Sequence, residues 1–309
     1  MSTLCFYVGI VQKPRPSGGL RVIYRIVELL LELGIPAAIV GGADSVLMFE
    51  TTLEADHIWA EERVGREDIV IFPETDMRPV SRFAPNRKWI FCQNHYYVFN
   101  QLGDAPPWEE LGIERVICSS LTILRFVSQT FPNIPRSYLP CFVESQLFRP
   151  QAKIRQIAYM PRKRTREAKF VMGALPRLYP EFIGIPWVRI DAVTVRQAAE
   201  LMNVSAVFLS LATLEGFGLP AIEAMSSGCL VAGFAGGGGD EYANSSNGFW
   251  CADDDPMGAV HALSHALSIL RAAPEVARLM IVNGVKVAGS YSRERTALSA
   301  REIWSMALA

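Results

Sequence analysis

Short apolar stretches rich in β-branched and aromatic residues alternate, along the first half of the chain, with longer stretches whose apolar residues recur at helical spacing. The pattern predicts strands at 4–10, 36–41, 68–72, 88–92, 115–118 and 137–140, and helices at 20–33 and 121–130. Strands that alternate with helices in this way are typical of a mostly parallel, doubly wound sheet. The first half of the chain is therefore predicted to have an α/β fold.

The same pattern starts again after residue 150. Strands are predicted at 157–160, 187–190, 205–211 and 230–234, a helix after Pro220, and closing helices at 256–272, 274–288 and 292–308. Two successive α/β units predict two Rossmann-like domains that face each other across a cleft. We place an N-terminal domain at 1–147, a second domain at 148–290 and a C-terminal helix at 291–309.

Composition narrows the class of protein. The chain has 309 residues, 50% of them hydrophobic and 20% charged, and a formal net charge of −1, which argues against a nucleic-acid binder. Its six cysteines form no CxxC pair, so we expect buried, reduced thiols. No apolar run approaches the roughly 18 residues that a membrane span needs, and the N-terminus lacks a signal-peptide pattern. A cytoplasmic protein is expected, and the sequence carries no signal for an oligomeric state.

The stretch TLEGFGLPAIEAMSSG, residues 213–228, follows one of the predicted strands directly. Ligands of doubly wound sheets bind at the carboxyl ends of strands, and Gly216 and Gly218 let the backbone approach a ligand closely. Glu215 in the loop and Glu223 in the first turns of the next helix can line one pocket, where they would accept hydrogen bonds from sugar or ribose hydroxyls. Taken alone, Glu223 is explained equally well as a charge that complements the helix dipole.

The string EGFGLPAIEAMSSG resembles the nucleotide-sugar signature of retaining glycosyltransferases with the GT-B fold, especially glycosyltransferase family 4, the glycosyl transferases group 1. The resemblance is clearest over 143–255 and extends to 17–34 and 91–95. It implies that Glu215 binds the donor sugar near the reacting centre and that Glu223 binds the ribose hydroxyls. The residues that it assigns to the donor-binding loop between the two acids are Gly216, Phe217, Gly218 and Leu219. It also implies a chain end that crosses back to the first domain.

A run of basic residues, MPRKRTREAK at 160–169, follows another predicted strand. Such runs are usually solvated surface, but the family places an Arg and a Lys here on the donor diphosphate. Arg162 is the best match, and its charge would stabilise the leaving group in place of a metal ion. Where the family has the Lys, this chain has Glu167, so Lys163 and Arg166 remain alternative partners.

Two glycine-rich loops are further candidates for donor contacts. Gly18 and Gly19, with Ser17, lie between the first predicted strand and helix, where their amides could meet a diphosphate. They lack the GxGxxG spacing of a dinucleotide-binding turn. The stretch AGGGGDEY resembles the family's glycine-rich loop before a Glu, so Asp240 and Glu241 are weaker candidates for sugar contacts, and plain flexibility is the alternative.

The strand ends of the first domain supply candidates for the acceptor side. Gln93, Asn94 and His95 follow one predicted strand, and Glu74 follows another. A single histidine is more often structural than catalytic. The resemblance raises His95 as a catalytic residue, and proton transfer and sugar binding both stay open as its role.

Together these residues predict a retaining, metal-independent glycosyltransferase. It would move a sugar from a nucleotide-diphosphate-sugar donor, bound by the second domain, to a hydroxyl of a glycan, lipid-linked sugar or small molecule, bound by the first. Retention is implied by the family alone. We expect no metal or other cofactor, because no metal-binding motif is present and the acidic cluster 253–255 is interpreted as a helix N-cap. Relatives that act on lipid-linked acceptors add the expectation of peripheral contact with the inner membrane surface.

Two alternatives remain open. A nucleotide-sugar epimerase has the same two-domain plan and would form its product from the donor alone. A non-catalytic sugar-nucleotide-binding protein could be built on a degenerate transferase fold, and Glu167 in place of a Lys makes that conceivable.

Overall fold

The computed structural model of the chain describes residues 2–9, 18–41, 47, 49–102 and 107–308. It divides into two compact units. Unit 1 comprises Met1–Cys141 together with Glu294–Ala309, and unit 2 comprises Phe142–Arg293. Among the described residues, no helix has the length and apolar character needed to cross a membrane.

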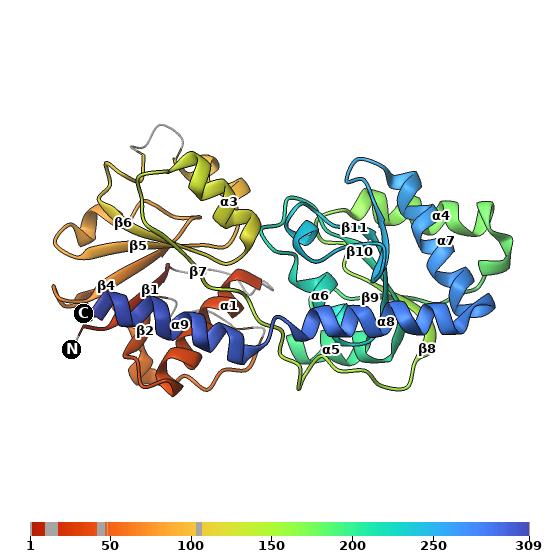
Figure 1. Cartoon of the computed structure of the whole chain (residues 1–309), viewed down its shortest axis with the longest axis horizontal. Coiled ribbons are helices and arrows are strands. Elements are labelled where there is room, and N and C mark those ends of the chain that lie inside the picture. Colours follow the sequence, from red (N-terminus) through yellow and green to blue (C-terminus); the bar gives the residue numbers. More distant parts are fainter. Residues whose placement is uncertain (1, 10–17, 42–46, 48, 103–106, 309) are drawn as a thin grey trace. The chain divides into compact units, whose positions relative to one another are not determined.

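Unit 1 is built on a parallel sheet with the strand order β3-β2-β1-β4-β5-β6-β7 (Figure 1). Its strands are β1 (Leu4–Gly9), β2 (Ala37–Gly41), β3 (Ile58–Trp59), β4 (Ile69–Pro73), β5 (Arg87–Cys92), β6 (Ile113–Cys118) and β7 (Arg136–Tyr138). Its α-helices are α1 (Gly18–Glu32), α2 (Val98–Leu102), α3 (Leu121–Thr130) and α9 (Arg293–Leu308). Short 3₁₀ turns cover Ala55–His57, Glu61–Arg63, Val80–Phe83 and His95–Tyr97.

Alternate residues of the unit 1 strands face opposite sides of the sheet. Val70 and Ile90 face one side, where they share a buried cluster with Val127 of α3. On the other side, Trp89 stacks on Trp304 of α9 at 5.2 Å between ring centroids. The strands therefore read as continuous apolar runs because both faces of the sheet are covered.

Unit 2 contains a parallel sheet with the order β12-β11-β10-β8-β9. Its strands are β8 (Ile154–Tyr159), β9 (Trp187–Arg189), β10 (Ser205–Leu211), β11 (Leu230–Phe234) and β12 (Gly248–Cys251). Its α-helices are α4 (Thr165–Leu178), α5 (Val195–Val204), α6 (Leu219–Ser226), α7 (Pro256–Ala272) and α8 (Pro274–Gly289), with 3₁₀ turns at Pro180–Phe182 and Gly238–Glu241. Val171 of α4 and Leu263 of α7 join Leu209 of β10 in one buried cluster.

The predicted strands and helices agree with this architecture except at short or terminal elements. The edge strands β3 and β12 were not predicted, and α1 begins at Gly18 rather than at residue 20. Gly18 and Gly19 are thus the first two residues of a helix and not loop residues, which corrects the sequence-based interpretation. Ser17 lies outside the described residues. The described cysteines form no disulfide, and all are buried except Cys251, which is half-buried.

Candidate functional site

The loop that carries Glu215 leaves the carboxyl end of β10 and is held by a second, glycine-rich loop. The backbone N–H of Glu215 donates to the carbonyl of Gly236 at 2.9 Å, and Glu215 forms an isolated parallel bridge with Gly237. Leu214, just before it, adopts a left-handed backbone with φ of 48°. Non-glycine residues rarely adopt this conformation, so the two hydrogen-bonded loops hold Glu215 in a fixed place.

Two of the four consecutive glycines of this second loop, Gly236 and Gly238, are required by close packing. A Cβ added to Gly238 would lie 2.5 Å from the carbonyl carbon of Gly216 and 2.5 Å from the nitrogen of Phe217. A Cβ on Gly236 would lie 2.6 Å from the Cβ of Ala212. The glycines therefore allow two backbones to touch, and the interpretation of this stretch as plain flexibility is wrong.

Lys163 and Glu215 form an ion pair at the carboxyl ends of the neighbouring strands β8 and β10. The Lys163 Nζ lies 2.8 Å from Glu215 Oε1, and it also donates to the carbonyl of Thr213 at 3.3 Å. The two charged side chains are 24% and 21% exposed, so solvent and small ligands can reach them. An ammonium group has three donors, and these contacts use two of them.

The other basic residues of the run 160–169 divide into two kinds. Arg164 is buried, donates from Nε to the carbonyl of Ala212 at 3.0 Å and lies over the ring of Phe234 at 4.1 Å. Arg162 and Arg166 are exposed near the start of α4. Arg164 thus supports the loop after β10, whereas Arg162 and Arg166 are exposed to solvent.

Glu223 is 5% exposed and lies in α6, the helix that follows the Glu215 loop. The helix starts from Gly218, whose left-handed backbone has φ of 88°. The hydroxyl of Tyr242 donates to the Gly218 carbonyl at 2.6 Å. Burial raises the pKa of Tyr242 well above its ordinary value, and the nearby charges of Glu215, Glu241 and Glu223 raise it further. The Tyr242 hydroxyl therefore keeps its proton, which it donates to the Gly218 carbonyl.

Phe217 is buried on an aromatic support beneath the loop. Its ring centroid lies 5.5 Å from that of Tyr242 and 5.0 Å from that of Tyr291. Glu241 is tied to the same group, because it accepts a hydrogen bond from the Tyr291 hydroxyl at 3.0 Å. Asp240 is exposed as a whole, but protein covers part of its carboxyl group. This partial desolvation raises the pKa of Asp240, and the charge of Asp253 makes a smaller contribution in the same direction.

Sequence reasoning missed Tyr242, Tyr291, Arg164 and Asp253 as parts of this site. Asp253, interpreted as part of a helix cap, instead accepts the backbone N–H of Gly236 at 3.0 Å. The cap itself is formed by Asp255, which accepts from Gly258 N at 2.7 Å, as predicted. Tyr242 directly follows Asp240 and Glu241 of the glycine-rich loop, so its hydroxyl could have been predicted as a hydrogen-bond donor beside these acids.

In unit 1 the candidate residues of two strand-end loops lie close to the first turn of α1. Glu74, which follows β4, accepts the backbone N–H of Gln93 after β5 at 3.0 Å. The side chain of Gln93 in turn donates to the carbonyl of Gly19 at 3.2 Å. Glu74 is 3% exposed, and burial raises its pKa to about 7, although hydrogen bonds from its own backbone and those of Gln93 and Asn94 lower it.

His95 begins the 3₁₀ turn that Asn94 caps through a hydrogen bond from Tyr96 N at 3.0 Å. Its ring centroid lies 4.1 Å from that of Tyr96 and 5.2 Å from that of Phe126. Its Nδ1 is buried without a hydrogen-bond partner among the described residues. Burial also lowers the pKa of His95, which favours the neutral imidazole that can accept or donate a proton.

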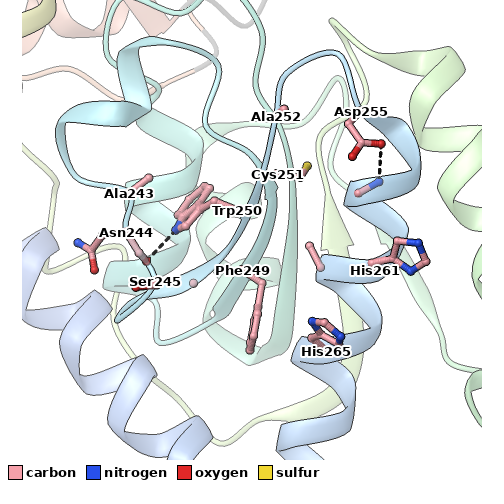
Figure 2. A pocket seen from close by; sticks show the side chains of 13 residues that line it. Ala243, Asn244, Ser245, Phe249, Trp250, Cys251, Ala252, Asp255, His261 and His265 are labelled. Atoms are coloured by element: carbon pink, nitrogen blue, oxygen red, sulfur yellow. Dashed lines mark hydrogen bonds between the residues drawn. The ribbon is translucent and has the colours of Figure 1, made fainter.

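A separate pocket of about 550 Å³ lies along β12, the edge strand of unit 2. Figure 2 shows His265 of α7 beside Phe249 of this strand, with His261 farther along the same helix. None of the predicted site residues is among the described residues that line it. Over the described part of the chain, no group of three or more His, Cys, Asp or Glu side chains could hold a metal ion.

Comparison with known proteins gives the family. Residues 191–278, which include Glu215, Glu223 and the glycine-rich loop, match the family model described as glycosyl transferases group 1. An alpha-1,6-glucosyltransferase of Actinobacillus pleuropneumoniae serotype 7 (strain AP76) is 31% identical over 245 residues, which are 74% of this chain and 72% of that protein. The chain belongs to the glycosyl transferases group 1 family. It is a glycosyltransferase, as the sequence predicted.

Solved structures show that this glycosyltransferase has the predicted GT-B fold. Sucrose-phosphate synthase from Thermosynechococcus elongatus matches with a TM-score of 0.72 at 13% identity, over 100% of this chain and 99% of that chain. The Anabaena protein HepE, solved in complex with UDP and glucose, matches with a TM-score of 0.71 at 14% identity, over 99% and 100%. The pneumococcal O-GlcNAc transferase GtfA, solved with UDP and GlcNAc, gives 0.71 at 10% identity, over 99% of each chain.

Proposed function

We propose that this glycosyltransferase transfers a glucosyl group from UDP-glucose to an acceptor hydroxyl, with retention of configuration and without a metal ion. A glucosyl donor is supported by the glucosyltransferase that is 31% identical to the chain. UDP is supported by the structures of similar fold that were solved with it. Retention is supported by the likeness to trehalose-6-phosphate synthase, an enzyme whose structure is described as giving insight into glycosyl transfer with retention.

The observation that carries this proposal is the ion pair between Lys163 and Glu215, with Glu223 on the helix that follows. Lys163 holds the Glu215 carboxylate at the strand ends and keeps a third N–H donor for a phosphate oxygen. Arg162 and Arg166 are exposed at the same loop and helix start and add positive charge. Cations at this place neutralise a departing diphosphate, which is the role that a metal ion has in other transferases.

In the proposed reaction the bond between the sugar C1 and the diphosphate oxygen breaks, and its electron pair leaves with UDP. The acceptor oxygen forms a new bond to C1 on the same face, and its proton passes to the departing diphosphate oxygen. Glu215 orients the sugar and supports the positive charge that develops near C1, while Glu223 accepts hydrogen bonds from the ribose hydroxyls. Unit 1 binds the acceptor through His95 and Gln93.

The test is UDP binding and UDP-glucose turnover by three variants. Glu223→Ala should weaken UDP binding by about 10- to 100-fold, because a charged hydrogen-bond acceptor is lost. Glu215→Ala should keep UDP binding and lose at least about 100-fold in turnover, since it acts on the sugar. Glu200→Ala, which removes an exposed carboxylate of unit 2, is the matched control and should change neither quantity.

Calorimetry gives the UDP affinity, and NMR of the product gives the anomeric configuration. Equal UDP affinity of Glu223→Ala and the unchanged protein would refute the ribose assignment. A product with inverted configuration would refute retention, and activity that disappears with a chelator would refute metal independence. If a different nucleotide sugar supports turnover while UDP-glucose does not, the donor assignment is wrong.

A further inference from the structure

Glu74 holds the loop that carries the acceptor-side candidates by accepting hydrogen bonds from its backbone. Its Oε2 accepts the Gln93 N–H at 3.0 Å, and the carboxyl group also accepts from the backbones of Asn94 and of Glu74 itself. At 3% exposure the side chain is covered by protein. A buried acceptor with three backbone donors holds in place the two loops that follow β4 and β5.

The fixed backbone determines the position of the 3₁₀ turn that begins at His95. Asn94, whose N–H binds Glu74, caps the 3₁₀ turn His95–Tyr97 by accepting from Tyr96 N at 3.0 Å. On the other side, Gln93 reaches the first turn of α1 through the Gly19 carbonyl at 3.2 Å. The ends of β4 and β5 and the start of α1 are thus joined in one hydrogen-bonded chain.

We infer that Glu74 is a positioning residue of the transferase, which sets the place of His95 and Gln93 without touching the acceptor itself. The inference rests on the proposed function in that it assigns acceptor binding to unit 1. It replaces the sequence-based interpretation of Glu74 as an acceptor contact, because its side chain is only 3% exposed and its carboxyl group already accepts hydrogen bonds from the backbone.

The unit also contains a matched control at the opposite end of the same sheet. Asp68, just before β4, is 8% exposed and accepts the backbone N–H groups of Thr3 and Gly65, both at 2.8 Å. It resembles Glu74 in burial and in its backbone partners, but it lies at the amino end of the strand. Removing it should reduce stability without moving His95.

The experiment measures the titration of His95 by NMR of protein labelled at its four histidines. The His95 signal is assigned as the one that disappears in His95→Gln. In Glu74→Ala the midpoint of the His95 titration should rise by about half a pH unit or more, because the ring becomes more exposed and burial is what lowers its pKa. Glu74→Gln, which keeps one acceptor oxygen, should give a smaller rise, and Asp68→Ala should give none.

The direction of the shift decides between mechanisms. A fall in the midpoint, the result expected if Glu74 acted on His95 through its negative charge, would overturn the inference. An unchanged midpoint in both Glu74 variants, or an equal rise in Asp68→Ala, would also overturn it. If Glu74→Ala does not fold, the same criteria apply to Glu74→Gln alone.

A second measurement separates this inference from the proposed function. Turnover in Glu74→Ala should fall by about 10-fold or more while UDP affinity, which depends on unit 2, stays unchanged. Turnover equal to that of Asp68→Ala would contradict a positioning role. If no nucleotide sugar is turned over, the proposed function fails, but the histidine titration still tests whether Glu74 positions His95.

Discussion

At the scale of single residues, Glu74 makes the stability of unit 1 depend on pH. Burial raises its pKa from 4.5 to about 7, so between these values the folded chain holds a proton that the unfolded chain has lost. The stabilisation is complete below about pH 4.5 and is lost as pH rises through 7, an effect on the order of 3 kcal/mol. Urea unfolding at pH 5 and pH 8 should show a smaller decrease for Glu74→Gln than for the unchanged protein. An identical decrease in both would contradict the shifted pKa.

Some site residues of unit 2 could be identified from the sequence, whereas their contacts could not. Glu215 and Lys163 could be singled out because each stands in a recognisable string, but their ion pair depends on two strand-end loops that are far apart in the sequence. Arg164 could not be distinguished from Arg162, since only the fold shows that it lies over Phe234. The sequence shows that a side chain is charged, whereas its burial depends on which other side chains pack against it.

At the scale of elements, the contact between the two loops of unit 2 can be tested with one methyl group. In Gly238→Ala the new Cβ would lie 2.5 Å from backbone atoms of Gly216 and Phe217, so the loops must separate. We expect a loss of about 1–3 kcal/mol in unfolding free energy and at least 10-fold weaker UDP binding, measured by urea unfolding and calorimetry. Gly289→Ala, which has nothing within 4 Å of its Cβ, is the control. UDP affinity that is unchanged in Gly238→Ala would show that this packing does not shape the donor site.

Elements covered on both faces were predictable, and edge elements were not. β10, with all seven residues buried, gives the continuous apolar run SAVFLSL. β3 has only two residues, and β12, in which only Gly248 is fully buried, follows a turn-rich stretch, so neither produces a run that stands out. The start of α1 was misplaced because two glycines read as a loop, whereas a helix tolerates them in its first turn.

At the scale of the whole molecule, the sequence indicates how many parallel-sheet units there are but not how each is assembled. Alternating strands and helices predicted both sheets, yet the pattern contains nothing that puts β1 between β2 and β4. The last helix, α9, was predicted from its apolar spacing. Its packing within unit 1 depends on Trp304, whose ring contacts those of Phe6 and Trp89, two residues from much earlier in the chain.

Trp304 should therefore hold unit 1 together from the end of the chain. Its side chain is 0% exposed and stacks on Trp89 at 5.2 Å, so Trp304→Ala leaves a large cavity and should cost about 3–5 kcal/mol. Leu298→Ala on the same helix removes a side chain that is 64% exposed and should cost less than about 0.5 kcal/mol. Hydrogen exchange should show amides of β1 and β5 losing protection in Trp304→Ala while those of β10 keep it. Equal losses in both sheets would mean that α9 stabilises the chain as one cooperative body rather than unit 1 alone.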